Sequence, residues 1–258
     1  MTGGPDGQSQ GVPCWVELHT SDPAAATAFY TGLFGWTYQD VGPAGSQRGR
    51  FLRHGRPVAG LTECPSGSGY RNAWVMYLST RSAAASIATA LRHGGQLVTG
   101  PAEVDGLGTA AVLRDPAGAL VGVSEAGSDN GFDGFDGPGT VGWLEHHSPD
   151  LAWSRSFYQQ VFGWRIQALA QTRMIQYLQA SVGPRVVTGL VSTHPHSLAD
   201  NPSRWAVYFT VAEVDDERAR VVQLGGSVLT PAESSPFVDL ADVADPTGAY
   251  FKLQSAPV

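Results

Sequence analysis

FYTGLFGW at residues 29–36 and FYQQVFGW at residues 157–164 decide the fold of this chain. Both stretches open with the same two aromatic residues and close with the same Phe-Gly-Trp. Apolar side chains at helical spacing, followed by a glycine, are typical of a helix that ends in a left-handed residue. The two copies therefore predict the same helix end twice, in two homologous modules.

The repeat extends through most of the chain. Three pairs of segments align in the same order: 14–36 with 142–164, 74–82 with 205–213, and 114–123 with 244–253. A Gly/Asp-rich stretch without helical periodicity separates the two copies. We therefore predict a disordered tail at 1–12, a first module at 13–125, a linker at 126–140 and a second module at 141–256.

Each module is predicted to be α+β, with a β-α-β-β-β order and a further short helix before its last strands. Asp22 and Asp150 precede the first helices and suit N-cap positions. Alternation along the preceding strand places three side chains of each module on one face. They are Trp15, Glu17 and His19 in the first module and Trp143, Glu145 and His147 in the second.

Composition excludes several classes of protein. The 258 residues are 42% hydrophobic and 15% charged, with a net charge of −7 and no block of Lys or Arg. Nucleic acid is therefore not an expected partner, because its phosphates require a basic surface. No apolar run has the length of a membrane span, and the N-terminus does not resemble a signal peptide. These features predict a cytoplasmic protein in which Cys14 and Cys64 are free thiols.

The repeated motifs resemble the vicinal oxygen chelate superfamily of glyoxalases, bleomycin-resistance proteins and extradiol dioxygenases. The shared features are FY-x-x-x-FGW, the W-x-x-Y strand, the helix ending in Gly-Gly and the closing DP-x-G turn. The chain looks most like the tandem actinobacterial proteins labelled "hydroxylase" or "glyoxalase-like". The resemblance implies a paired, open-barrel fold, that is, an intramolecular pseudo-dimer that is a monomer or weak homodimer. It also implies one cavity per module, which holds a divalent metal in catalytic members and a drug in others.

The positions at which the resemblance implies metal ligands hold poor ligands in this chain. They are Trp15, Val75 and Gly122 in the first module and Trp143, Ala206 and Lys252 in the second. Indoles, aliphatic side chains and protonated amines do not bind divalent cations. We therefore expect no cofactor, and a divalent metal is the less favoured alternative.

Acidic and imidazole side chains are the candidates that remain for chemistry. The predicted catalytic residues are Glu17, Glu145, His19 and His147. A carboxylate beside an aromatic wall suits a general base. The alternative is structural, with each glutamate bound by an arginine or by backbone amides. An unusual metal site built from the same four side chains also stays open, although two ligands per module are too few.

Aromatic side chains are the candidates for holding a ligand. The predicted ligand-binding residues are Trp15, Trp143, Tyr77, Tyr208, Trp74 and Trp205. Such a lining suits a flat, mostly apolar molecule with one or two polar groups. Core packing is the alternative for the two tyrosines. His146 stands where the first module has Leu18, on the face expected to pack against a helix, so we expect a hydrogen bond there.

Three functions compete. The first is a metal-independent tailoring enzyme that acts on an aromatic or polyketide-type secondary metabolite through acid–base residues. The second is a binding protein that sequesters a drug or metabolite, as bleomycin-resistance proteins do. The third is a metal-dependent lyase or dioxygenase, which the ligand positions disfavour.

Overall fold

The computed structural model describes residues 10–42, 47–64, 72–104, 108–125, 137–172, 176–192, 203–230, 233–234 and 238–256. Most of the predicted tail at 1–12 and of the predicted linker at 126–140 lies outside these residues. In the described part of the chain, no helix is both long and apolar enough to cross a membrane.

The first repeat folds as two successive βαβββ motifs. Its first motif comprises β1 (Pro13–Thr20), α1 (Pro23–Phe34), β2 (Thr37–Asp40), β3 (Arg48–Arg53) and β4 (Arg56–Glu63). Its second motif comprises β5 (Ala73–Thr80), α2 (Ala83–Arg92), β6 (Gln96–Val104), β7 (Gly108–Arg114) and β8 (Leu120–Glu125).

The second repeat has the same order of elements. Its first motif comprises β9 (Val141–Ser148), α3 (Leu151–Phe162), β10 (Arg165–Gln171), β11 (Gln176–Val182) and β12 (Arg185–Ser192). Its second comprises β13 (Arg204–Val211), α4 (Val214–Gln223), β14 (Ser227–Val228), β15 (Glu233–Ser234), β16 (Asp239–Ala244) and β17 (Tyr250–Ser255). The predicted α+β class with tandem modules is confirmed, and the further short helix of each module is the helix of a second motif.

The strands of each repeat follow one sheet order. It is β2-β3-β4-β1-β5-β8-β7-β6 in the first repeat and β10-β11-β12-β9-β13-β17-β16-β14 in the second. Parallel pairs join β1 to β4 and β9 to β12, while the hairpins that flank them are antiparallel. This register sets Glu17 beside Gly60 and Glu145 beside Gly189.

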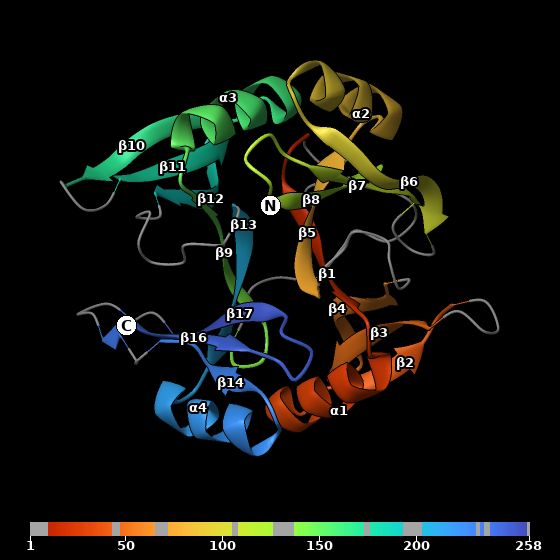
Figure 1. The fold of residues 1–258 in the computed structure, drawn as a ribbon, viewed down its shortest axis with the longest axis vertical. Helices are drawn as coiled ribbons and strands as arrows, with labels where there is room; N and C mark the ends of the chain where they lie inside the picture. Colours follow the sequence, from red (N-terminus) through yellow and green to blue (C-terminus); the bar gives the residue numbers. More distant parts are fainter. Residues whose placement is uncertain are drawn as a thin grey trace, which may run out of the picture. The chain divides into compact units, whose positions relative to one another are not determined.

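The chain packs into two compact units that cut across the repeats. Unit 1 contains α2 with β6–β8 and α3 with β10–β12, and unit 2 contains α1 with β2–β4 and α4 with β14–β17. The chain crosses between units inside β1, β5, β9 and β13, after Trp15, Val75, Leu144 and Trp205. Figure 1 shows the resulting helix pairs, α2 with α3 in unit 1 and α1 with α4 in unit 2.

Both copies of the opening motif form the predicted helix. Asp22 accepts a hydrogen bond from the Ala25 amide at 3.0 Å, and Asp150 accepts one from the Trp153 amide at 3.0 Å. The helices end at Gly35 and Gly163, whose φ angles of 66° and 70° lie in the left-handed region. The side-chain caps and the glycines therefore fix both ends of α1 and α3.

The tryptophan that follows each glycine is buried. In unit 2, the Trp36 indole donates to the Gly139 carbonyl at 2.9 Å and stacks on Tyr30. In unit 1, the Trp164 indole donates to the Gly11 carbonyl at 2.7 Å and lies 4.9 Å from the Tyr158 ring. Each indole thus fills the core under its helix with its N–H satisfied.

Candidate functional site

Alternation along the strands separates an apolar face from a polar face. In unit 2, Phe51, Phe209 and Phe251 pack against the aromatic residues of α1. Their strand neighbours Arg50, Tyr208 and Lys252 therefore point to the opposite side, which we call the helix-distal face. Of the polar residues predicted from the sequence, Glu17, His19 and Tyr208 belong to unit 2 and lie on this face.

Glu17 and His19 meet on the helix-distal face of unit 2. The Glu17 carboxylate lies 3.4 Å from His19 Nε2, and both residues are buried. Glu17 also accepts a hydrogen bond from Arg48 Nη2 at 2.8 Å. Because the Glu17 side chain is only 3% exposed, this charge-assisted pair is shielded from water. The Glu17 carboxylate therefore has both the histidine and an arginine as partners.

A second charged pair lies on the closing strands of unit 2. Tyr208 on β13 pairs in register with Lys252 on β17, and the Lys252 ammonium lies 5.2 Å from the Tyr208 ring centroid. The same ammonium lies 2.9 Å from Asp242, which also accepts a hydrogen bond from the Tyr250 hydroxyl at 3.0 Å. Lys252 is thus held by a carboxylate and an aromatic ring together.

Glu145 and His147 meet in the same way in unit 1. His147 Nε2 lies 2.9 Å from a Glu145 carboxylate oxygen, at ion-pair distance. The side chains are 10% and 12% exposed, compared with 3% and 7% for Glu17 and His19. This dyad is therefore somewhat more open to solvent than its counterpart.

Tyr177 shares the space above Gly189 with Glu145. A Cβ added at Gly189 would collide with the Tyr177 hydroxyl and would lie 3.3 Å from Glu145 Oε1. Glycine at this position, which pairs in register with Glu145, therefore lets the phenol and the carboxylate converge.

Tyr77 covers another glycine in unit 1. Tyr77 and Gly122 pair in register, and a Cβ at Gly122 would overlap the Tyr77 ring. Tyr77 is buried, with 4% of its surface exposed. The ring therefore occupies the place in which a longer side chain at position 122 would stand.

The residues at the ligand positions implied by the family do not fit a divalent cation. Position 122 is a glycine under a phenol ring, and the matched Lys252 brings a positive charge. Val75 and Ala206 are fully buried and carry no donor atom. Among the described residues, no three His, Cys, Asp or Glu side chains are grouped to hold a metal ion. The independence from metal stays a prediction, to which the chemistry of these side chains lends support.

Trp74 and Trp205 lie in the aromatic cores. The Trp74 indole donates to the Tyr30 hydroxyl at 2.9 Å, and the Trp205 indole donates to the Tyr158 hydroxyl at 2.8 Å. Alternation along β5 and β13 points these indoles away from the faces of Tyr77 and Tyr208. We therefore leave both tryptophans out of the site.

Trp15 and Trp143, the tryptophans predicted to bind a ligand on the first strand of each repeat, lie in different units. Trp15 is buried and belongs to unit 1, whereas Glu17 belongs to unit 2. Trp143 is half-buried and belongs to unit 2, whereas Glu145 belongs to unit 1. Their role as ligand-binding residues stays a prediction.

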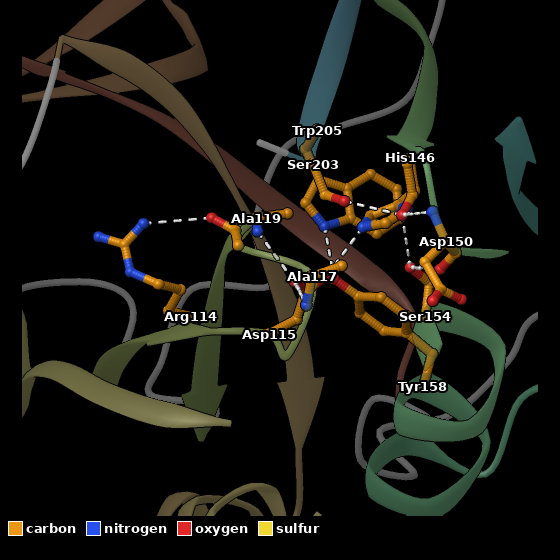
Figure 2. A network of polar contacts seen from close by, with 12 residues as sticks. Arg114, Asp115, Ala117, Ala119, His146, Asp150, Ser154, Tyr158, Ser203 and Trp205 are labelled. Carbon is orange, nitrogen blue, oxygen red and sulfur yellow. Dashed lines mark hydrogen bonds and ion pairs between the residues drawn. The ribbon is translucent and has the colours of Figure 1, made fainter. Parts of the chain in front are cut away.

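A buried polar network in unit 1 joins His146 to Asp115 and Tyr158 (Figure 2). His146 Nε2 lies 2.8 Å from Asp115 Oδ2, and the Tyr158 hydroxyl donates to the same oxygen at 3.0 Å. Burial, and then the Asp115 charge, raise the pKa of Tyr158 well above its usual value. The hydrogen bond expected of His146 is confirmed, but its partner in the DP-x-G turn could not be predicted from local sequence.

Comparison with known proteins agrees with this architecture. Residues 14–123 match the model of the Glyoxalase/Bleomycin resistance protein/Dioxygenase superfamily, and residues 143–254 match a Glyoxalase-like domain. The chain is 31% identical to "Anthracycline biosynthesis protein DauV" of Streptomyces sp. (strain C5), over 94% of this chain and 92% of that protein. It is also 31% identical to "Putative glyoxylase CFP32" of Mycobacterium bovis, over 96% of both chains.

A solved structure shares the fold. The 2,3-dioxygenase LapB from Pseudomonas sp. KL28 aligns with 97% of this chain and 94% of its own, with a TM-score of 0.63 and 13% identity. At that identity the likeness concerns the fold alone. The tandem repeat, the two family matches and the full-length relatives together establish that the chain belongs to the glyoxalase/bleomycin-resistance/dioxygenase superfamily, also called vicinal oxygen chelate.

Proposed function

We propose that the chain is a tailoring enzyme that acts on an aromatic, polyketide-type secondary metabolite through acid–base side chains and without a resident metal. One observation carries the proposal. A carboxylate and an imidazole meet on the helix-distal face at matched positions, Glu17 with His19 and Glu145 with His147. Anthracycline biosynthesis, which the name of one full-length relative states, supports the substrate class.

A Glu/His dyad of this kind can take a proton from a substrate and return it. A carboxylate next to an imidazole stabilises the imidazolium, so the histidine accepts a proton more readily. Phenols and carbons flanked by carbonyl groups, which are common in aromatic polyketides, release protons to bases of this strength. A proton that leaves one substrate atom and returns at another produces a tautomer, and this reaction requires no oxidant and no metal.

Sequestration is the second candidate. Tyr77 and Tyr208 are buried and occupy matched positions, and such rings suit the flat surface of an apolar ligand. A sequestering protein would bind one ligand tightly and release it unchanged. Turnover is therefore the property that separates the two candidates.

The test uses the full chain and an anthracyclinone, the aglycone class of the anthracyclines. We expect chelator-dialysed protein to convert the compound into an isomer, which chromatography separates from the substrate and mass spectrometry shows to have the same mass. The double variant Glu17→Gln/Glu145→Gln should be slower by about 100-fold or more, the contribution typical of a general base. Glu213→Gln, which alters an exposed glutamate outside the site, is the matched control.

Two results would contradict the proposal. Loss of turnover on dialysis, with recovery on adding Mn²⁺ or Fe²⁺, would mean that the reaction depends on a metal. Stoichiometric binding with full recovery of unchanged anthracyclinone would favour sequestration instead.

A further inference from the structure

Each repeat carries a DP-x-G turn whose aspartate is buried against a helix of the other repeat. Asp115, between β7 and β8, bonds to Tyr158 on α3 in unit 1. Asp245, between β16 and β17, lies beside Tyr30 on α1 in unit 2. Both aspartates are only 3% exposed. Because an ionised carboxylate is costly to bury without donors, the partners of each aspartate decide its protonation state.

In unit 1, donors occupy both oxygens of the Asp115 carboxylate (Figure 2). Oδ1 accepts hydrogen bonds from the amides of Ala117 and Ala119, each at 2.9 Å. Oδ2 accepts a hydrogen bond from the Tyr158 hydroxyl at 3.0 Å and lies 2.8 Å from His146 Nε2. An ionised carboxylate has no proton to give, so the imidazole is the donor of this last bond. Asp115 is therefore held in its ionised form.

In unit 2, donors occupy only one oxygen of the Asp245 carboxylate. Oδ1 accepts hydrogen bonds from the Thr247 amide at 2.8 Å, the Thr247 hydroxyl at 2.7 Å and the Ala249 amide at 3.0 Å. Among the described residues, Oδ2 meets no donor at hydrogen-bond geometry, and the Tyr30 hydroxyl approaches Asp245 without reaching that geometry. Asp245 thus keeps a buried oxygen without a donor.

The difference between the two turns is traced to one position. His146 on β9 corresponds to Leu18 on β1, and the registers agree, since His146 pairs with Leu190 and Leu18 pairs with Leu61. Both side chains are fully buried. The repeat that supplies β1 to unit 2 therefore brings an aliphatic side chain where unit 1 has an N–H donor.

The surroundings of Asp245 favour its neutral form. Burial raises the pKa of Asp245 above its usual value of 3.8, and the groups that oppose this shift belong to Thr247, Ala249 and Tyr30. Tyr30 is the titratable group that faces Asp245 from α1. Burial, and then the Asp245 charge, raise the pKa of Tyr30 well above its usual value, so this residue stays a neutral phenol.

We propose that Asp245 is a proton-sensitive lock of unit 2, which closes when a solvent proton binds Oδ2 and the new O–H donates to the Tyr30 hydroxyl oxygen. That oxygen already accepts a hydrogen bond from the Trp74 indole at 2.9 Å and has a second lone pair for Asp245. The lock ties the closing turn of the second repeat to α1 of the first. It is independent of the proposed function, because no residue of the Glu/His dyads takes part.

The lock has a defined dependence on pH. Because folding raises the pKa of Asp245, the folded chain binds the proton more tightly than the unfolded chain does. The stabilisation from protonation is therefore complete below pH 3.8 and is lost as the pH rises through the pKa of the folded state.

Urea unfolding of the full chain, from neutral pH down to pH 3.8, tests the lock. The reference is Asp245→Asn, in which a neutral amide replaces the carboxylate. The wild type should gain stability relative to this variant as the pH falls, because only the wild type takes up the proton. We call this relative rise of the urea midpoint the acid gain. The same comparison with Asp115→Asn is the matched control and should show no acid gain, since donors already hold Asp115 ionised.

Exchanging the residues at the matched position then tests the cause. Leu18→His gives unit 2 the imidazole of unit 1. It should raise the urea midpoint at neutral pH and abolish the acid gain, measured against Leu18→His/Asp245→Asn. The mirror substitution His146→Leu removes a donor from Asp115. It should create an acid gain in unit 1, measured against His146→Leu/Asp115→Asn.

Each outcome decides the proposal. If the urea midpoints of wild type and Asp245→Asn change in parallel over the whole pH range, Asp245 takes up no proton and the lock does not exist. An acid gain that persists in folded Leu18→His would contradict the role given to the imidazole. If Leu18→His does not fold, as judged by circular dichroism, His146→Leu decides that role, and the absence of an acid gain there would overturn it.

Discussion

At the scale of single residues, the Tyr77 ring covers Gly122, a position at which the family resemblance implies a metal ligand. The Tyr77 ring lies where a side chain at position 122 would begin, so the site has room for the ring or for a ligand residue but not for both. The sequence predicts the poor ligand at position 122. It does not predict the ring above it, because the pairing of β5 with β8 brings together residues distant in the chain.

Gly122→Ala tests this packing. We expect a loss of about 1–3 kcal/mol in the free energy of unfolding, because the new Cβ forces the Tyr77 ring to move in a filled core. In a Tyr77→Ala background the same substitution should cost much less. Urea denaturation of the four proteins measures the coupling. Equal costs in both backgrounds would mean that the ring does not fill this space.

His146 and the two core tryptophans show what local sequence can reveal about single residues. Trp74 and Tyr77 are three residues apart on β5, so alternation alone places their side chains on opposite faces of the sheet. His146 differs from Leu18 in the other repeat and thereby indicates a hydrogen bond. The bond reaches Asp115, on a turn that is remote in sequence, so only the folded chain identifies the partner.

At the scale of elements, the repeated helix end is the part of the fold that sequence predicts best. The caps at Asp22 and Asp150, the glycines and the buried tryptophans all follow from local rules of backbone conformation and helical spacing. The second motif of each repeat was less visible in the sequence, since its outer strands carry many exposed residues and little alternation. β6 illustrates this, because most of its residues are exposed.

Gly163→Ala tests the helix end directly. A Cβ at Gly163 would meet no atom within 4 Å, so any cost comes from the left-handed backbone alone. We expect about 1–2 kcal/mol of destabilisation, and less for Gly163→Asn, which tolerates that conformation. Gly35→Ala is the matched control, because its backbone and its surroundings are equivalent. Unequal costs at the two glycines, measured by thermal unfolding, would contradict the equivalence.

At the scale of the whole molecule, the repeats and the compact units are different divisions of one chain. Sequence similarity identifies the two repeats as copies of one ancestral segment. It does not indicate which of their motifs pack around the same core. Unit 1 accordingly joins motifs from both repeats, and so does unit 2. The dyads Glu17–His19 and Glu145–His147 could be predicted, because each lies on one strand. Their arginine and tyrosine neighbours come from other strands and could not.

Alkaline pH should destabilise the protein. Burial raises the pKa of Cys14 from 9.0 to about 12 and that of Cys64 from 9.0 to about 11. Above pH 9 the unfolded chain therefore loses thiol protons that the folded chain keeps, so the free energy of unfolding falls as pH rises toward 12. Denaturant titrations on both sides of pH 9 measure how steeply the free energy of unfolding falls with pH.

The double variant Cys14→Ala/Cys64→Ala supplies the control for that slope. Its stability should fall less steeply than that of the wild type between pH 9.0 and about 11, the range in which the thiols differ. If stability falls equally steeply with pH in both proteins, groups other than the two thiols cause the loss of stability at alkaline pH.

The central claim is that a Glu/His dyad performs proton chemistry in a fold whose metal positions hold other residues. Turnover of an anthracyclinone by exhaustively chelated protein tests it most directly. The account predicts that chelated wild type still converts the compound and that chelated Glu17→Gln/Glu145→Gln does so about 100-fold more slowly. Conversion by the wild type that stops on chelation and returns with added Mn²⁺ or Fe²⁺ would contradict it.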